Sequence, residues 1–237
     1  MIKTISIMQP YIFPYIGYMN LVKASNVFVF YDDVNFIKRG WINRNRIILF
    51  GKPYRFTIPL KGSSQNKLIK DLRPENINNF SKKFLNQLSF SYRDAPYLRQ
   101  TLNYVEEVLL SENKSIGDLA ASSVEKFFEY CDLNKLFFKS SIRFKSTHDL
   151  RGVERLLEIT KHLEADQYVN AIGGMDLYSQ SDFEGTGISL SFLKPNLYEY
   201  SQVNSKEYFP GLSIIDLMMN QSIIDLRNHL DRYDLVE

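Results

Sequence analysis

Short apolar runs that end in polar turns alternate with stretches of helical periodicity along most of this chain. Residues 4–8 and 27–31 are mostly apolar, β-branched or aromatic, and each run is short enough to be a buried parallel strand. Between them, residues 14–25 carry apolar positions at helical spacing, and Pro14 suits a first helical turn. The pattern therefore predicts a strand–loop–helix–strand unit, with polar groups gathered at the carboxyl ends of the strands.

The next segment has the pattern of a hairpin and then of helices. Residues 41–50 and 54–60 are rich in Ile, Phe and Thr, and the Gly-Lys-Pro sequence between them predicts a β-hairpin. Residues 74–136 are helical in pattern, and residues 115–118 offer capping residues for a helix over 118–130. We expect this stretch to be a helical insert packed on the sheet.

The remainder of the chain returns to alternating strands and helices. Strands are predicted at 137–141, 168–172 and 188–193, and helices at 149–163 and 213–230. Thr147 or Asp149 could cap the first of these helices. The alternation favours a mainly parallel sheet with helices on both faces, in a single α/β domain over residues 1–237 with the insert of 74–136 inside it.

Composition narrows the class of protein. The 237 residues are 44% hydrophobic and 24% charged, which is ordinary for a soluble globular protein, and no apolar run approaches the ~20 residues of a membrane span. The net charge is only +2, with Lys and Arg spread along the chain, so there is no nucleic-acid signature. One cysteine and three separated histidines predict no disulfide and no metal site, and they suit a reducing cytoplasm. The sequence does not identify the oligomeric state.

Aromatic residues are abundant, with 15 Tyr and 17 Phe. An AT-rich genome would favour such codons, and sites for sugars or nucleobases would also use these rings. Only Tyr11, Tyr15, Tyr18 and Trp41 lie where other residues also indicate a site.

Asp32 and Asp33 follow a predicted strand at the edge where α/β proteins bind ligands. Adjacent strand residues point to opposite faces, so we expect at most one carboxylate to face a given ligand. That carboxylate could hold an amine, a ribose hydroxyl, a metal ion or an arginine. Alternatively, it caps a turn.

The second group of polar residues is Trp41-Ile-Asn-Arg-Asn45. On a strand, Trp41, Asn43 and Asn45 share one face and Arg44 takes the other. A planar guanidinium suits a phosphate or a carboxylate, and two amides suit sugar or base recognition. An exposed hairpin with a structural Arg–Asp pair is the alternative.

Two weaker signals lie further along the chain. His148 precedes a predicted helix and could act as a general base, although a solvated loop histidine is the commoner case. Gly173 and Gly174 follow a strand and permit close backbone approach to a ligand, but they lack the dinucleotide fingerprint. Cys131 lies among apolar residues, which indicates packing.

Four segments together resemble the WbqC-like protein family: Gln9–Tyr18, Tyr31–Phe36, Trp41–Asn45 and Phe209–Leu217. The chain has Asn35 where that family more usually has Gln, which preserves an amide. The resemblance implies a role in bacterial surface polysaccharide (O-antigen) biosynthesis, with a proposed transfer of glycine or another acyl unit to a sugar. The site candidates that it adds or supports are Gln9, Tyr11, Tyr15, Gly17, Tyr18, Asp32, Asp33, Asn35, Trp41, Asn43, Arg44, Asn45, Ser213 and Asp216.

A fainter likeness concerns architecture, since class I nucleotidyltransferase-like (Rossmannoid) domains begin with a similar strand, Pro-bearing loop and helix. Those enzymes carry histidines in that first loop and helix. Here Gln9, Tyr11 and Tyr15 occupy the region, so the likeness extends to the fold alone.

We therefore expect an aminoacyl- or acyltransferase that acts on a nucleotide-linked amino sugar, with an unidentified acyl donor or carrier as its second partner. Asp32, Asp33 or His148 would be the base, Arg44 would bind the diphosphate, and Trp41 with the tyrosines would stack on base or sugar. A nucleotide-dependent ligase or nucleotidyltransferase with Mg²⁺ at an aspartate is the alternative enzyme, and a sugar-binding or scaffold protein is the non-enzymatic one. The transferase hypothesis requires Gln9, Asp33 and Arg44 to converge in one cleft.

Overall fold

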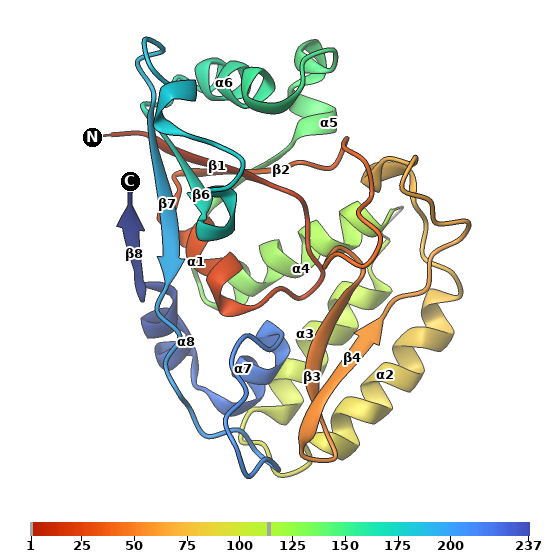
Figure 1. Ribbon diagram of the computed structural model, residues 1–237. Helices are drawn as coiled ribbons and strands as arrows, with labels where there is room; N and C mark the ends of the chain where they lie inside the picture. Colours follow the sequence, from red (N-terminus) through yellow and green to blue (C-terminus); the bar gives the residue numbers. More distant parts are fainter. Residues whose placement is uncertain (1, 113–114) are drawn as a thin grey trace.

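A six-stranded sheet forms the centre of the molecule in the computed structural model, which describes residues 2–112 and 115–237 (Figure 1). Its strands, in sheet order, are β5 (Leu136–Lys139), β2 (Val27–Phe30), β1 (Thr4–Met8), β6 (Gln167–Ala171), β7 (Ser189–Pro195) and β8 (Tyr233–Val236). The first five are parallel, and β8 pairs antiparallel with β7. The predicted α/β class with a mainly parallel sheet is confirmed, but the sequence analysis missed β8, which is a short, largely exposed edge strand.

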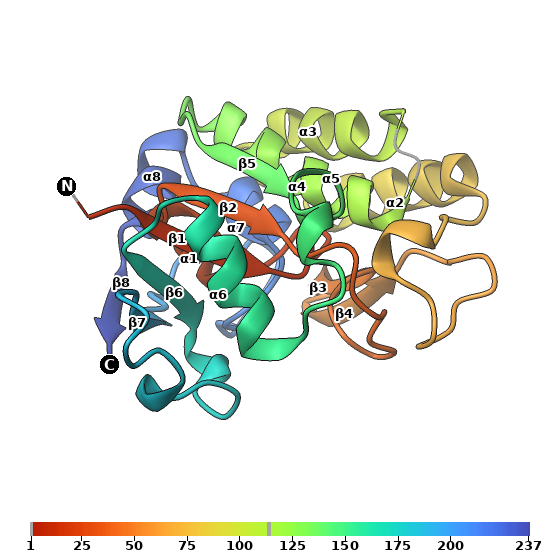
Figure 2. The same ribbon diagram turned by 90° about the horizontal axis from the view of Figure 1, so that it is seen from above.

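Helices cover both faces of this sheet, as the alternation of β2 shows. Val27 and Val29 belong to the core under α6 (Gly152–His162), whereas Phe28 and Phe30 belong to the core shared with α1 (Ile16–Ala24). Figure 2 shows the same sheet from above, with α6 crossing it. The period of two along a strand thus divides its side chains between two separate cores.

The predicted hairpin forms a second sheet with strands β3 (Arg44–Leu49) and β4 (Lys52–Thr57). Three long helices follow it: α2 (Ile77–Ser91), α3 (Leu98–Leu110) and α4 (Ile116–Tyr130). Phe56 of β4 packs on Phe84 of α2, with ring centroids 4.5 Å apart. The helices therefore pack on the hairpin as well as on the main sheet. The single-domain organisation stays a prediction.

Several predicted boundaries are corrected by the structure. Pro14 lies before α1 rather than in its first turn, because its carbonyl accepts a hydrogen bond from Ile214 N. The predicted helix over 213–230 is two helices, α7 (Ile214–Asn220) and α8 (Ile223–Leu230), because the chain is extended at Gln221 and Ser222.

The segment after β5 is also corrected. Ser140 begins the short helix α5 (Ser140–Arg143) instead of ending a strand. Neither predicted residue caps α6, since Arg151 occupies the cap position and the Thr147 hydroxyl donates to Phe144 O. Short 3-10 helices lie at Ile69–Asp71, Lys145–Thr147, Ile172–Gly174 and Gln180–Asp182.

The strand order changes direction at the boundary between β1 and β6. After β1 the chain builds β2 and β5 on one side, and it then returns to build β6 and β7 on the other. Open α/β sheets bind ligands beyond the carboxyl ends of the strands at such a point. The loops after β1 and β6 are therefore the places to look for a site. No helix of the described residues is long and apolar enough to span a bilayer.

Candidate functional site

The loop that follows β1 is held in one conformation by the surrounding structure. Phe13 has a φ of +41°, which is strained for a residue with a side chain. Its N–H donates to Ser123 Oγ (3.0 Å), and its carbonyl accepts from Asn45 Nδ2 (2.8 Å) and Ser213 Oγ (2.7 Å). Three bonds from three elements fix this residue, so the neighbouring side chains are presented rigidly.

Those neighbours line a hollow of about 300 Å³, whose walls are Tyr11, Pro14, Tyr15, Trp41, Asn45, Arg46 and Gly211. Burial raises the pKa of Tyr15, and burial together with the nearby Tyr15 raises the pKa of Tyr11. Both phenols therefore keep their protons at neutral pH and can donate hydrogen bonds. The hollow combines aromatic faces with hydroxyl donors.

Arg46 supplies the positive charge of the hollow. Its guanidinium carbon lies 5.9 Å from the centre of the Trp41 ring, and Nη2 donates to Gly211 O at 3.2 Å. The buried Nε of Arg46 has no hydrogen-bond partner among the described residues. Sequence reasoning selected Arg44 instead, although the alternation of β3 puts Arg44 and Arg46 on the same strand face.

The remaining hairpin candidates lie outside the lining of the hollow. Arg44 Nε donates to Gly40 O (2.7 Å), and burial together with Arg55 and Arg39 lowers the pKa of Arg44. Asn43 Nδ2 donates to Ile58 O (2.8 Å) beside the base of the hairpin.

Three further candidates on the segments after β1 and β2 also lie outside it. Asn35 is exposed and forms a β-bridge with Leu68. Tyr18 is buried, and its hydroxyl donates to the Gln9 carbonyl at 2.9 Å. That bond ties the start of the loop to α1 and leaves the half-buried Gln9 side chain at the end of β1.

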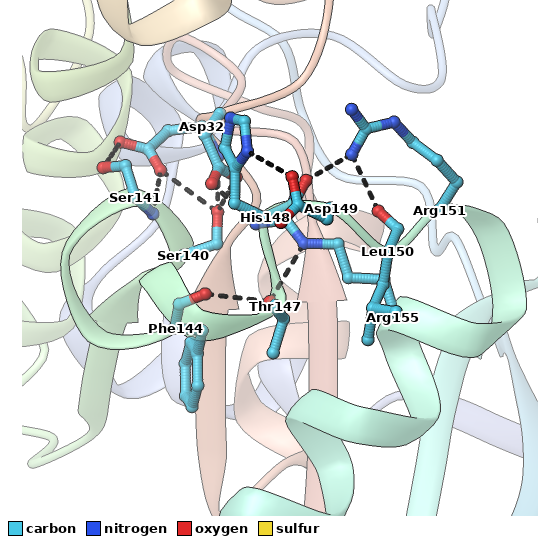
Figure 3. Close-up of polar contacts among 11 residues, drawn as sticks. Asp32, Ser140, Ser141, Phe144, Thr147, His148, Asp149, Leu150, Arg151 and Arg155 are labelled. Carbon is cyan, nitrogen blue, oxygen red and sulfur yellow. Dashed lines mark hydrogen bonds and ion pairs between the residues drawn. The ribbon is translucent and has the colours of Figure 1, made fainter.

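Asp32 and Asp33 form a second polar group with the start of α5. Figure 3 shows Asp32 beside Ser140 and Ser141. Asp32 accepts from Ser141 N (3.0 Å) and Ser141 Oγ (2.7 Å), and Ser140 Oγ contacts both carboxylates, at 3.2 Å from Asp32 and 2.5 Å from Asp33. The expectation that the two aspartates point to opposite faces is wrong, because β2 ends at Phe30, before both residues, and both carboxylates contact the Ser140 hydroxyl.

Asp33 is committed to a buried ion pair. Arg155 Nη2 lies 2.6 Å from its carboxylate, and both side chains are 2% exposed. Burial raises the pKa of Asp33, but hydrogen bonds from Arg155 and Ser140 outweigh burial, so the pKa is lowered overall. The guanidinium also lies 4.9 Å from the Tyr31 ring centre and donates through Nε to Thr147 (3.1 Å).

His148 is the exposed member of this region. Its Nδ1 lies 3.6 Å from Asp149 Oδ1, and 56% of its side chain is exposed (Figure 3). None of the residues lining the hollow belongs to the Asp32–Asp33 group. The hollow likewise brings together Tyr11, Tyr15, Trp41 and Asn45 without Gln9, Asp33 or Arg44. The expected convergence of those three residues in one cleft is therefore wrong, and a transferase mechanism would have to rest on the residues that do line the hollow.

Ser213 and Asp216 are fully buried, and Ser213 is bonded to the Phe13 carbonyl in the loop beside the hollow. The Asp216 carboxylate accepts from Tyr92 Oη (2.7 Å), Tyr200 Oη (2.6 Å) and Gln202 Nε2 (3.1 Å). Burial raises the pKa of Asp216 in spite of these hydrogen bonds. Ser213 and Asp216 therefore stabilise the fold and are not accessible to a ligand.

The glycines are explained by close packing at two positions. A Cβ on Gly17 would lie 2.4 Å from Tyr15 Cε2, so glycine lets the Tyr15 ring lie across the start of α1. A Cβ on Gly174 would lie 2.4 Å from Asn170 Nδ2, whereas the exposed Gly173 has open space around it.

No three His, Cys, Asp or Glu side chains of residues 2–112 and 115–237 are grouped so that they could hold a metal ion. The carboxylates of Asp32 and Asp33 are already occupied by serine hydroxyls, an amide and Arg155.

The fold and this edge of the sheet define an open, mainly parallel α/β protein with an aromatic hollow beside its first strand. The chain belongs to the WbqC-like protein family, whose sequence profile matches residues 9–228. It is similar to the uncharacterized protein Rv1507c of Mycobacterium tuberculosis, with 24% identity over 225 residues that cover 92% of this chain and 94% of the relative. No solved structure matches the chain significantly.

Proposed function

We propose that the protein binds a nucleotide-linked amino sugar in the aromatic hollow and transfers an acyl or aminoacyl group to its amine, in the synthesis of a bacterial surface polysaccharide. The observation that carries the proposal is the hollow itself, in which Tyr11, Tyr15 and Trp41 surround the Arg46 guanidinium. The pathway is the one that the family resemblance implies.

The size and chemistry of the hollow suit a sugar carrying an anionic group. Its volume of about 300 Å³ is at the lower end of ligand pockets, which fits one ring better than a whole nucleotide. Aromatic faces pack against the C–H face of a sugar ring, and the protonated phenols of Tyr11 and Tyr15 can bond its hydroxyls. The Arg46 guanidinium then meets the anionic substituent.

In the transfer step, the sugar amine attacks the acyl carbonyl of an ester or thioester donor. A C–N bond forms, the bond from the carbonyl to the carrier breaks, and the amine gives up a proton. Among the three candidate bases, Asp33 is held as a carboxylate by Arg155, and Asp32 is 3% exposed. His148 has an exposed imidazole, but none of the three candidates lines the hollow, so in this proposal the amine binds in its neutral form and its proton passes to the carrier group that leaves.

Thermal-shift measurements with UDP-glucosamine test the binding step. We expect the melting temperature of the wild type to rise with this ligand, because a ligand of the native state stabilises it. Trp41→Ala should remove the shift, whereas Tyr54→Ala should keep it, since Tyr54 is a comparably exposed aromatic residue outside the hollow. A shift that needs ATP with Mg²⁺ would favour the ligase, and no shift with either ligand would favour the scaffold.

The amine of the acceptor provides the test of the reaction. UDP-glucosamine should gain an acyl mass, whereas UDP-N-acetylglucosamine, whose amine is blocked, should bind without reacting. His148→Asn should leave kcat and KM close to the wild-type values, because His148 does not line the hollow, whereas loss of a general base would lower kcat by about 10²-fold or more. A fall of that size at similar KM would identify His148 as the base and contradict the placement of the reaction in the hollow.

A further inference from the structure

Four arginines gather on and beside the hairpin, and one of them, Arg46, lines the hollow. Arg46 lies directly opposite Arg55 in the register of β3 and β4, and Arg44 lies on the same face of β3 as Arg46. Arg39, in the loop before β3, and Arg55 are both close enough to Arg44 to contribute, after burial, to the lowering of its pKa. We call Arg39, Arg44, Arg46 and Arg55 the arginine face.

No acidic side chain compensates this charge within the described ranges 2–112 and 115–237. Three other arginines, Arg93, Arg155 and Arg227, each pair with an aspartate, but no member of the arginine face forms an ion pair. Like charges directly opposite in a hairpin are destabilising. A sequence that places them there anyway incurs this cost without an internal partner.

Arg46 joins the arginine face to the hollow. Its Nη2 is bonded to a carbonyl and its guanidinium faces Trp41, but the buried Nε lacks a partner, and no acid lines the hollow. A buried N–H without an acceptor is costly, and a charge-assisted bond to an anion would satisfy it. The anion would then lie next to a ring held by Tyr11, Tyr15 and Trp41.

We propose that the arginine face binds the diphosphate of a sugar diphosphate, with Arg46 on the phosphate nearest to the sugar and Arg55, Arg44 and Arg39 along the rest. The site and its sugar rest on the proposed function, whereas the anion class rests on the four guanidiniums. Several planar forks exceed what one carboxylate needs and match the spread charge of two phosphates. The diphosphate could belong to a nucleotide or to a lipid carrier.

Isothermal titration with UDP, geranyl diphosphate and uridine tests this assignment and separates the two sources. We expect at least one of UDP and geranyl diphosphate to bind. If UDP is the ligand, uridine should bind at least tenfold more weakly than UDP. Arg46→Gln should weaken diphosphate binding by about tenfold or more, as one lost charge-assisted bond predicts. Arg55→Gln should weaken it about threefold, since its exposed side chain is more screened.

Two controls keep the result interpretable. Arg99→Gln removes an exposed arginine of α3, remote in sequence from the hairpin, and should leave the affinity unchanged. Arg46→Lys should recover only part of the loss, because lysine keeps the charge without the planar fork. Arg55→Gln should fold like the wild type, since Arg55 is exposed and its side chain makes no hydrogen bond or ion pair within residues 2–112 and 115–237.

Wild-type affinity for the diphosphates in both Arg46→Gln and Arg55→Gln would overturn the inference, as would equally tight binding of a short single-stranded oligonucleotide. If UDP-glucosamine still binds and depends on Trp41 but not on these arginines, the inference fails while the proposed function stands. If geranyl diphosphate binds more tightly than UDP and depends on the arginines, the inference stands while the nucleotide-linked substrate is wrong.

Discussion

At the scale of single residues, some of the site residues predicted from the sequence line the hollow, and others fix the position of the residues that line it. Tyr15 and Trp41 line the hollow, whereas Asn45 mainly secures the strained Phe13 through its amide. Gly17 is needed because the Tyr15 ring occupies the space of its missing Cβ. A motif of this kind therefore contains ligand contacts and the residues that aim them.

Gly17→Ala should displace the Tyr15 ring and weaken ligand binding about tenfold, with little change in the melting temperature. The added methyl meets only the end of a movable side chain, and alanine is the better helix former. UDP-glucosamine titration and thermal unfolding measure the two effects.

A double-mutant cycle supplies the control for this prediction. In a Tyr15→Ala background, Gly17→Ala should have no further effect on affinity, because the ring that the methyl displaces is gone. Equal losses of affinity in both backgrounds would show that Gly17 acts independently of Tyr15.

At the scale of elements, capping decides where the last two helices begin. Ser213 caps α7 and also donates to Phe13 O, whereas Ser222 caps α8 by accepting from Asp225 N. Helical periodicity runs through both segments, so the sequence predicted one helix; the extended backbone at Gln221 and Ser222 divides it. Periodicity identifies the buried face better than it identifies the ends.

Ser222→Ala should lower the free energy of unfolding by about 1 kcal/mol, which is a typical loss for an N-cap. Ser213→Ala should cost about 2 kcal/mol, because the buried hydroxyl also supports the loop after β1. Urea unfolding measures both values. Ser213→Ala should in addition weaken UDP-glucosamine binding, and equal behaviour of the two variants would contradict a role for Ser213 in holding that loop.

At the scale of the whole molecule, the Asp33–Arg155 pair connects the end of β2 to α6 across the segment that contains α5. Both partners are buried, so removing one leaves an uncompensated charge. The buried Asp216 carboxylate also connects separate parts of the chain, because it accepts hydrogen bonds that tie Tyr92, Tyr200 and Gln202 to α7.

Asp33→Asn should therefore destabilise the protein by about 3 kcal/mol at neutral pH, measured by urea unfolding. Because the folded pKa of Asp33 is lowered, its contribution is present above the unfolded value of about 4 and is lost as the pH falls through the folded pKa. The variant should lose less stability than the wild type on acidification below about pH 4.

Asp118 provides the comparison, since its pKa is also lowered: burial raises it, but hydrogen bonds from Lys139 and Ser115 prevail. Part of the acid sensitivity should therefore persist in Asp33→Asn. Parallel pH profiles for the variant and the wild type would show that the Asp33 carboxylate does not stabilise the fold.

Alternating apolar runs and helical periodicity were sufficient to predict the α/β class, the parallel strands and the hairpin, because burial of apolar side chains dictates these patterns locally. They also located the tyrosines and Trp41 that line the hollow. The edge strand β8 and the break between α7 and α8 carried no such local signal.

Only the tertiary structure decided which polar residues meet. It paired Asp33 with Arg155, 122 positions away, and it put Arg46 rather than Arg44 in the lining of the hollow. A pattern along the chain fixes the face on which a side chain lies, but a contact also depends on how distant segments pack and on which partners satisfy buried charges. For that reason the sequence determined the architecture and the chemical types of the candidate site, while the fold determined its members.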